Sequence, residues 1–68
     1  MSERTEWQLF RRPKGRTQMP WVEFGQSYDS KKKAIGRANA YSKTSYQYDY
    51  RVVERVLATE VVVLEVLQ

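Results

Sequence analysis

The chain has 68 residues, with 12 Lys or Arg against eight Asp or Glu, a formal net charge of +4, and neither Cys nor His. Without Cys there is no thiolate nucleophile, and without His the commonest general base and metal ligand are missing. The composition therefore makes a zinc site implausible, argues against most kinds of enzyme, and permits binding to nucleic acid or another acidic surface.

The length is that of one domain, so residues 1–68 are expected to fold as a single unit. No stretch approaches the roughly 18 apolar residues of a membrane span. The charged start, MSERTEW, lacks the apolar region of a signal peptide. Because the absence of Cys also suits a reducing compartment, the sequence predicts a cytoplasmic protein with no membrane partner.

A hairpin is predicted in the first part of the chain. Residues 6–12, EWQLFRR, alternate loosely and carry apolar side chains on both faces, which is typical of a strand. Residues 13–16, PKGR, have turn composition. Residues 21–28, WVEFGQSY, form the second predicted strand, with Pro20 just before it and Gly25 as the site of a bulge.

Residues 29–44, DSKKKAIGRANAYSKT, are the only segment with a helical period. Asp29 and Ser30 are both suitable N-caps, because a short side-chain oxygen can accept a bond from a free N–H of the first turn. The expected buried stripe is narrow and made largely of small side chains: Ala34, Ile35, Ala38 and Tyr41. The helix is therefore expected to lie close against a sheet.

Two features of this helix do not serve folding. Gly36 lies on the predicted exposed face and costs about 1 kcal/mol relative to Ala. It is either a tolerated surface glycine or a point of close approach for a partner. Lys31, Lys32 and Lys33 oppose the helix macrodipole, as either a solvated charged face or an anion-facing patch.

Two strands are predicted after the helix. Residues 46–56, YQYDYRVVERV, give the cleanest alternation in the chain, with Tyr46, Tyr48 and Tyr50 on one face. Residues 57–60 are expected to turn. Residues 61–67, VVVLEVL, are β-branched and apolar on both faces, as in a buried strand.

The predicted fold is α+β, with a single helix packed on one face of a four-stranded antiparallel sheet in the order β-β-α-β-β. A right-handed crossover places the third strand beside the first, so the sheet order is 2-1-3-4. The other face is left uncovered, with Phe10, Trp21 and Val53 among its apolar residues. Because the fourth strand is also an apolar edge, a homodimer is expected.

No catalytic, cofactor-binding or metal-binding residues are predicted. Glu23, Asp29, Asp49 and Glu54 could supply paired carboxylates, but no spacing brings two of them together. The glycines are scattered and form no phosphate loop. Nine aromatic rings in a small domain either fill the core or, at Tyr46 and Tyr48, form a stacking platform of the kind found in single-strand binders.

The predicted binding surface is basic and combines the first turn with the helix, since both elements are free to project into solvent. Self-repulsion among so many cations opposes folding, which favours a functional role. Its residues are Arg11, Arg12, Lys14, Arg16, Lys32, Lys33 and Arg37.

Asp29-Ser30, the spaced Ala34, Ala38 and Tyr41, and the strand YRVVER at 50–55 resemble small uncharacterised proteins of phages and mobile elements. The likeness covers roughly residues 7–59 and implies a hairpin, a helix and a second hairpin. The size and shape are also similar to those of anti-CRISPR proteins, which are non-enzymatic inhibitors of bacterial nucleoprotein defence complexes. That group shares no diagnostic motif, so the resemblance assigns no functional residue.

Many anti-CRISPR proteins are acidic DNA mimics, and the charge of +4 departs from that pattern. An inhibitor of this charge is expected to dock on an acidic protein surface or on guide-bound nucleic acid. The leading hypothesis is a phage-type inhibitor of a host defence nucleoprotein complex, acting in the host cytoplasm. The alternatives are a small basic nucleic-acid-binding accessory protein and a structural or assembly subunit.

Overall fold

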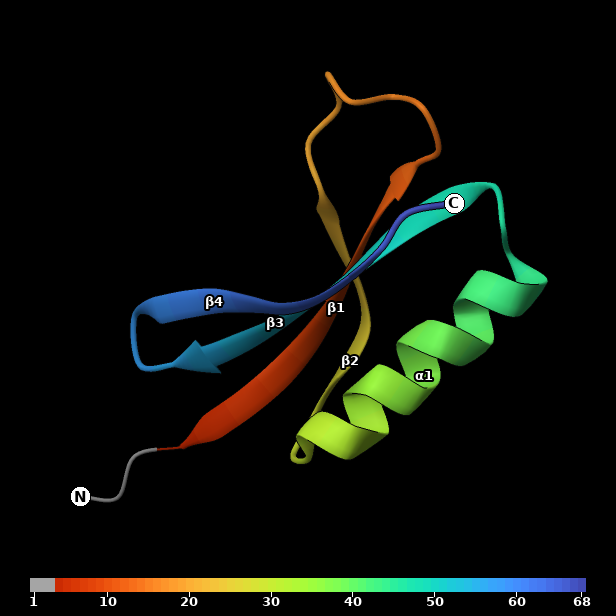
Figure 1. The fold of residues 1–68 in the computed structure, drawn as a ribbon. Coiled ribbons are helices and arrows are strands. Elements are labelled where there is room, and N and C mark those ends of the chain that lie inside the picture. The colour runs from red at the N-terminus through yellow and green to blue at the C-terminus, as the bar shows by residue number, and fades with distance from the viewer. Residues whose placement is uncertain (1–3) are drawn as a thin grey trace.

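The computed structural model describes residues 4–68 and shows one helix against a four-stranded antiparallel sheet. The strands are β1 (Thr5–Pro13), β2 (Val22–Tyr28), β3 (Tyr48–Val56) and β4 (Thr59–Val66), and α1 (Lys31–Thr44) connects β2 to β3 (Figure 1). The sheet order β2-β1-β3-β4 confirms the predicted α+β fold and its topology. No helix in the described part of the chain is long and apolar enough to cross a membrane.

The two central strands, β1 and β3, pair along their whole length, from Thr5 opposite Val56 to Pro13 opposite Tyr48. Because β3 returns antiparallel to β1, α1 must run back along the sheet from the end of β2 to the start of β3. The helix therefore begins at the end of the sheet opposite the β1–β2 turn (Figure 1).

The helix boundaries follow from its caps. The Ser30 side chain accepts a hydrogen bond from the Lys33 N–H at 3.4 Å, so Ser30 is the N-cap and Asp29 lies outside. At the other end the Ser45 N–H donates to the Tyr41 carbonyl at 2.7 Å. Ala34 and Ala38 are fully buried, as their periodicity predicted, and they let the helix lie close to the sheet. Ile35 is only half-buried and Tyr41 is exposed, so the buried stripe is narrower than predicted.

The core is small and lies under α1. Leu9 and Val52 are buried against Ala34 and Ala38, and Trp7, Phe24, Tyr28, Val63 and Leu64 pack around them. Tyr50 is 1% exposed, and its hydroxyl donates to the Ser45 carbonyl at 2.9 Å. This bond ties the helix C-terminus to the middle of the sheet.

The start of the third strand differs from the prediction. Tyr46 is 68% exposed and lies in a turn before β3, which begins at Tyr48. In this turn the Lys14 N–H donates a hydrogen bond to the Gln47 carbonyl at 2.9 Å. The chain is still in the turn at Tyr46 and Gln47 and enters the sheet at Tyr48. The alternating pattern of side chains begins two residues before β3, because sequence periodicity alone does not show where the crossover connection ends.

The β3–β4 turn is tighter than predicted, with only Leu57 and Ala58 between the paired residues Val56 and Thr59. Leu57 has φ 55°, a left-handed conformation that costs a side chain roughly 1–2 kcal/mol. A two-residue hairpin turn with positive φ at its first central position prefers Gly there.

We therefore expect Leu57→Gly to raise the free energy of unfolding by about 0.5–1 kcal/mol, because Leu57 is 73% exposed and leaves no cavity. Chemical denaturation would measure the change. Ala58→Gly is the matched control in the same turn, since Ala58 does not have positive φ. Equal effects of the two changes would contradict the explanation.

The sheet face opposite α1 is covered by the protein's own arginines. The guanidinium groups of Arg12 and Arg51 both lie over the Trp21 ring, at 4.4 and 4.2 Å from the ring centroid. Long side chains shield apolar surface while keeping their charges in water. The apolar face that the sequence predicted to be bare is therefore reduced to a shallow pocket lined in part by Phe10, Val53 and Val62.

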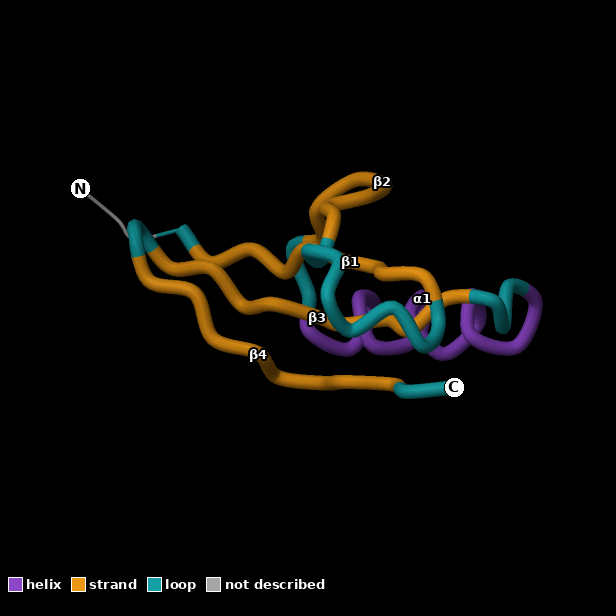
Figure 2. The backbone as a smooth tube through the Cα atoms, turned by 90° about the horizontal axis from the view of Figure 1, so that it is seen from above, coloured by secondary structure: helices purple, strands orange, loops and turns teal. Residues whose placement is uncertain are grey.

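The outer edge of β4 is apolar but interrupted. The register of the β3–β4 pair shifts between Val52 and Val53, so β4 carries a bulge. A bulge twists an edge strand and limits its pairing with another chain. Figure 2 shows β4 along one margin of the molecule and β2 rising away from the sheet at the other. The exposed apolar residues at the β4 margin are Leu57, Val61, Val62 and Leu67.

Candidate binding surface

The seven predicted basic residues do not form a single cluster. Arg11 lies on the helix side of the sheet, over the rings of Phe24 and Tyr48 at 5.0 and 4.4 Å. Arg12 lies on the opposite face, because neighbouring residues of a strand point to opposite sides. Lys14 and Arg16 are exposed in the β1–β2 turn, whereas Lys32 and Lys33 lie at the far end of α1.

The helix carries the clearest excess of positive charge. Lys31–Thr44 contains five Lys or Arg residues and no Asp or Glu. One carboxylate reaches this group, because Lys33 Nζ lies 3.5 Å from Asp29 Oδ1 just before the helix. Both side chains are largely exposed, so the pair compensates little of the charge.

The acidic residues are concentrated on the other face, where arginines neutralise them. Arg55 reaches across the sheet to Glu60 at 2.8 Å, Glu6 at 3.3 Å and Glu23 at 3.4 Å. The hydrogen bond to Glu60, with those to Glu23 and Glu6, raises the pKa of Arg55 above its ordinary value. Arg51 similarly binds Glu65 through two nitrogens, with Nε at 3.0 Å. The surplus positive charge is thus left on α1 and the β1–β2 turn.

A polar groove of about 630 Å³ lies beside α1, where the helix borders the end of β2 and the start of β1. We call it the helix–β2 groove. Its lining includes Arg4, Tyr28, Asp29, Lys33, Gly36 and Arg37. Lys33 and Arg37 reach it together because residues four apart share one side of a helix.

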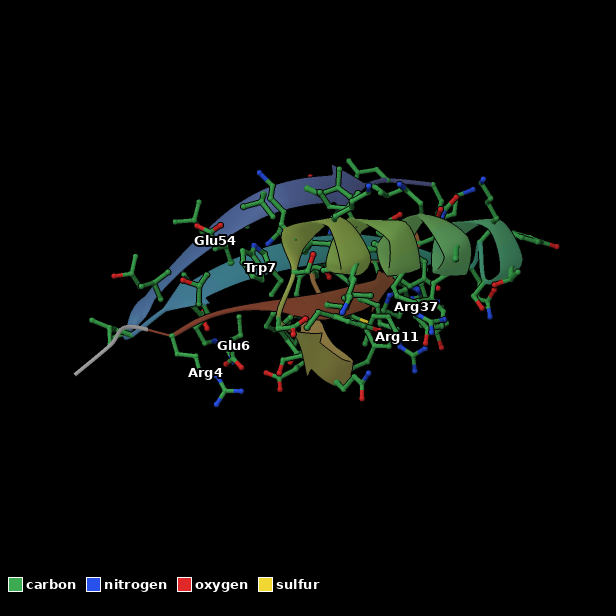
Figure 3. All side chains as sticks on the ribbon, turned by 90° about the horizontal axis from the view of Figure 1, so that it is seen from below. Arg4, Glu6, Trp7, Arg11, Arg37 and Glu54 are labelled. Atoms are coloured by element: carbon green, nitrogen blue, oxygen red, sulfur yellow. The ribbon has the colours of Figure 1, made fainter. Side chains whose placement is uncertain are left out.

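A group of aromatic rings continues this side of the molecule toward the β1–β2 turn. The Tyr41 ring lies 5.2 Å from Phe24 and 6.2 Å from Tyr50, and Tyr48 lies 6.4 Å from Tyr50. We call these four residues the aromatic cluster. In Figure 3, Arg4 and Glu6 lie toward one end of the sheet, and Arg37 and Arg11 lie further along, beside α1.

Sequence reasoning found part of this surface. It identified Lys33, Arg37 and the unusual Gly36, but gave no reason to include Arg4, which reaches the groove only through the pairing of β1 in the sheet. It also missed the hydrogen bond from Trp7 Nε1 to Glu54 Oε1 at 3.1 Å. Glu54, one of the four candidate carboxylates, is therefore a hydrogen-bond acceptor within the fold. Trp7 on β1 and Glu54 on β3 are directly opposite each other, so a correct alignment of these two strands from the sequence would have paired them.

The described residues contain no group of three His, Cys, Asp or Glu side chains placed to hold a metal ion. Comparison with known proteins finds no matching family model, no matching curated protein and no matching solved structure.

Proposed function

We propose that this protein is a non-enzymatic binding protein that acts by occupying an anionic surface of a macromolecular partner. The segregation of charge carries the proposal: α1 has five basic residues and no acidic ones, while Arg51 and Arg55 neutralise four glutamates on the opposite face. Folding does not require this arrangement, because Lys31 to Lys33 at a helix N-terminus oppose the macrodipole.

The partner class we propose is a host defence nucleoprotein complex, with the protein acting as a phage-type, anti-CRISPR-like inhibitor in the host cytoplasm. Support comes from the resemblance to small phage proteins and from the charge, because guide-bound nucleic acid and acidic protein surfaces both attract a basic helix. The absence of Cys and His supports a role without catalysis.

The test is a pull-down from bacterial lysate with the tagged protein, run with and without nuclease. Recovery of a defence nucleoprotein complex, together with loss of that complex's activity on addition of the purified protein, is the expected result. A captured complex that keeps full activity would contradict inhibition. Recovery that survives both nuclease treatment and high salt would identify a protein surface as the contact, since phosphate contacts weaken steeply with salt.

We also propose that the chain forms a homodimer through Val61 and Val62, the exposed apolar side chains within β4. Val61 is 51% exposed and Val62 46%. Contact through these side chains does not need the backbone edge of β4, whose pairing with another chain is limited by its bulge. Val61→Lys should shift sedimentation toward the monomer, because a buried unpaired ammonium group at the contact is strongly unfavourable. Val22→Lys on the exposed part of β2, at 56% exposure, is the control. A monomer at high concentration for the unmodified protein would contradict dimerisation.

A further inference from the structure

The glycine in the middle of α1 has no packing role inside the protein. A Cβ at Gly36 would meet no atom within 4 Å, and its φ is not positive, so neither crowding nor backbone conformation requires glycine. Glycine nevertheless costs the helix about 1 kcal/mol relative to Ala. Gly36 lines the helix–β2 groove, and because it has no side chain the groove stays open at this position.

The cations of this groove include two arginines, Arg4 and Arg37. Its lining also holds two carboxylates: Glu6 pairs with Arg55 at 3.3 Å, and Asp29 lies 3.5 Å from Lys33 in an exposed pair that compensates little charge. Within residues 4–68, neither Arg4 nor Arg37 forms a salt bridge. A guanidinium presents a planar fork of donors that matches the oxygens of a phosphate.

The aromatic cluster begins one helical turn beyond the groove. Tyr41 follows Arg37 by four residues and is 36% exposed. Its ring contacts Phe24, which also lies under the guanidinium of Arg11. The same side of the molecule therefore offers cations in the groove and then aromatic rings with Arg11 among them.

Resting on the proposed function, we infer that the helix–β2 groove binds the phosphodiester backbone of single-stranded nucleic acid, with bases stacked toward Tyr41. Single-strand binders combine a positive groove for the backbone with rings for the bases. Unpaired bases are required, because a base inside a duplex cannot reach a ring on the protein surface. The 14 residues of α1 span about 21 Å, which suits a site of on the order of four nucleotides.

The first experiment measures the binding of a fluorescein-labelled ten-residue oligo(dT) by fluorescence anisotropy across a salt series, with oligo(rU) as a second probe. Arg37→Gln should weaken binding at least about fivefold and lower the salt slope by about one, as loss of one phosphate contact does. Lys43→Gln is the matched control, since Lys43 lies about 120° around the helix from Arg37. It should change affinity less than about twofold.

The second experiment separates the groove from overall charge. Gly36→Gln adds a neutral side chain to the wall of the groove, so it should raise the melting temperature and weaken oligonucleotide binding at least about threefold. Asn39→Gln, at an exposed position of α1 outside the lining of the groove, should leave binding unchanged. Unchanged binding by Gly36→Gln, or equal effects of Arg37→Gln and Lys43→Gln, would overturn the inference.

A labelled peptide of ten glutamates distinguishes this inference from the proposed function. Binding of the peptide but not of either oligonucleotide would overturn the inference and leave recognition of an anionic protein surface intact. If neither the peptide nor the oligonucleotides bind at low salt, the inference is overturned. The proposed function then also loses the support that charge segregation gives it.

Discussion

Replacing Leu9 with Ala is expected to destabilise the protein by about 3 kcal/mol, because large-to-small changes in a core lose both transfer free energy and packing. Leu9 is 1% exposed and lies among Ala34, Ala38 and Val52. The two alanine side chains are too short to fill the cavity that the substitution leaves. A domain of this size has a total stability on the order of 3–10 kcal/mol, so the change removes a large share of it.

Thermal unfolding followed by circular dichroism would show a fall in melting temperature of about 15 °C or loss of the folded state. Leu67→Ala is the control, because Leu67 is 61% exposed and should change stability within about 0.5 kcal/mol. Equal destabilisation by the two changes would contradict the assignment of the core to the space beneath α1.

The combined reversal Lys32→Glu, Lys33→Glu and Arg37→Glu is expected to weaken partner binding at least tenfold, or about 1.4 kcal/mol. The change converts three cations on one helix into three anions, so attraction to an anionic surface becomes repulsion. Folding should be little affected, since the side chains are exposed and carboxylates near a helix N-terminus interact favourably with the macrodipole.

Affinity for the purified partner, measured by calorimetry or surface plasmon resonance, checks this result. The glutamine version at the same three positions separates lost attraction from added repulsion. Ala58→Glu with Thr59→Glu tests the effect of net charge away from the helix, because it lowers the charge by two at the β3–β4 turn, close to the change of three in the glutamine version. Unaltered binding by the triple variant would move the site to the sheet face that holds Trp21.

The folding pattern was largely readable from local periodicity. The small residues Ala34 and Ala38 recur at the helical spacing and are both fully buried, and the alternation of 48–56 corresponds to β3. One helix and four strands with a single crossover allow few arrangements, so chain order and handedness were enough to give the sheet order. Boundaries were less accurate, because Tyr46 continues an alternating pattern while its backbone is still in a turn.

The candidate surface was only partly readable. Alternation along a strand could have separated Arg11 from Arg12, since adjacent residues face opposite sides of a sheet. The distance between the β1–β2 turn and the start of α1 depends on the path of the helix along the sheet, which brings Lys33 and Arg37 to β2 instead of to Lys14.

The sequence by itself determined the helix, the alternation of the strands, the excess of positive charge and the lack of Cys and His chemistry, because each of these depends on residue type and near-neighbour spacing. Tertiary structure alone decided which charges are neutralised. Arg55 meets Glu6, Glu23 and Glu60 because pairing of the strands in register brings β1, β2 and β4 within reach of one guanidinium on β3. The helix–β2 groove has the same origin, since its walls come from three elements that meet only in the folded sheet.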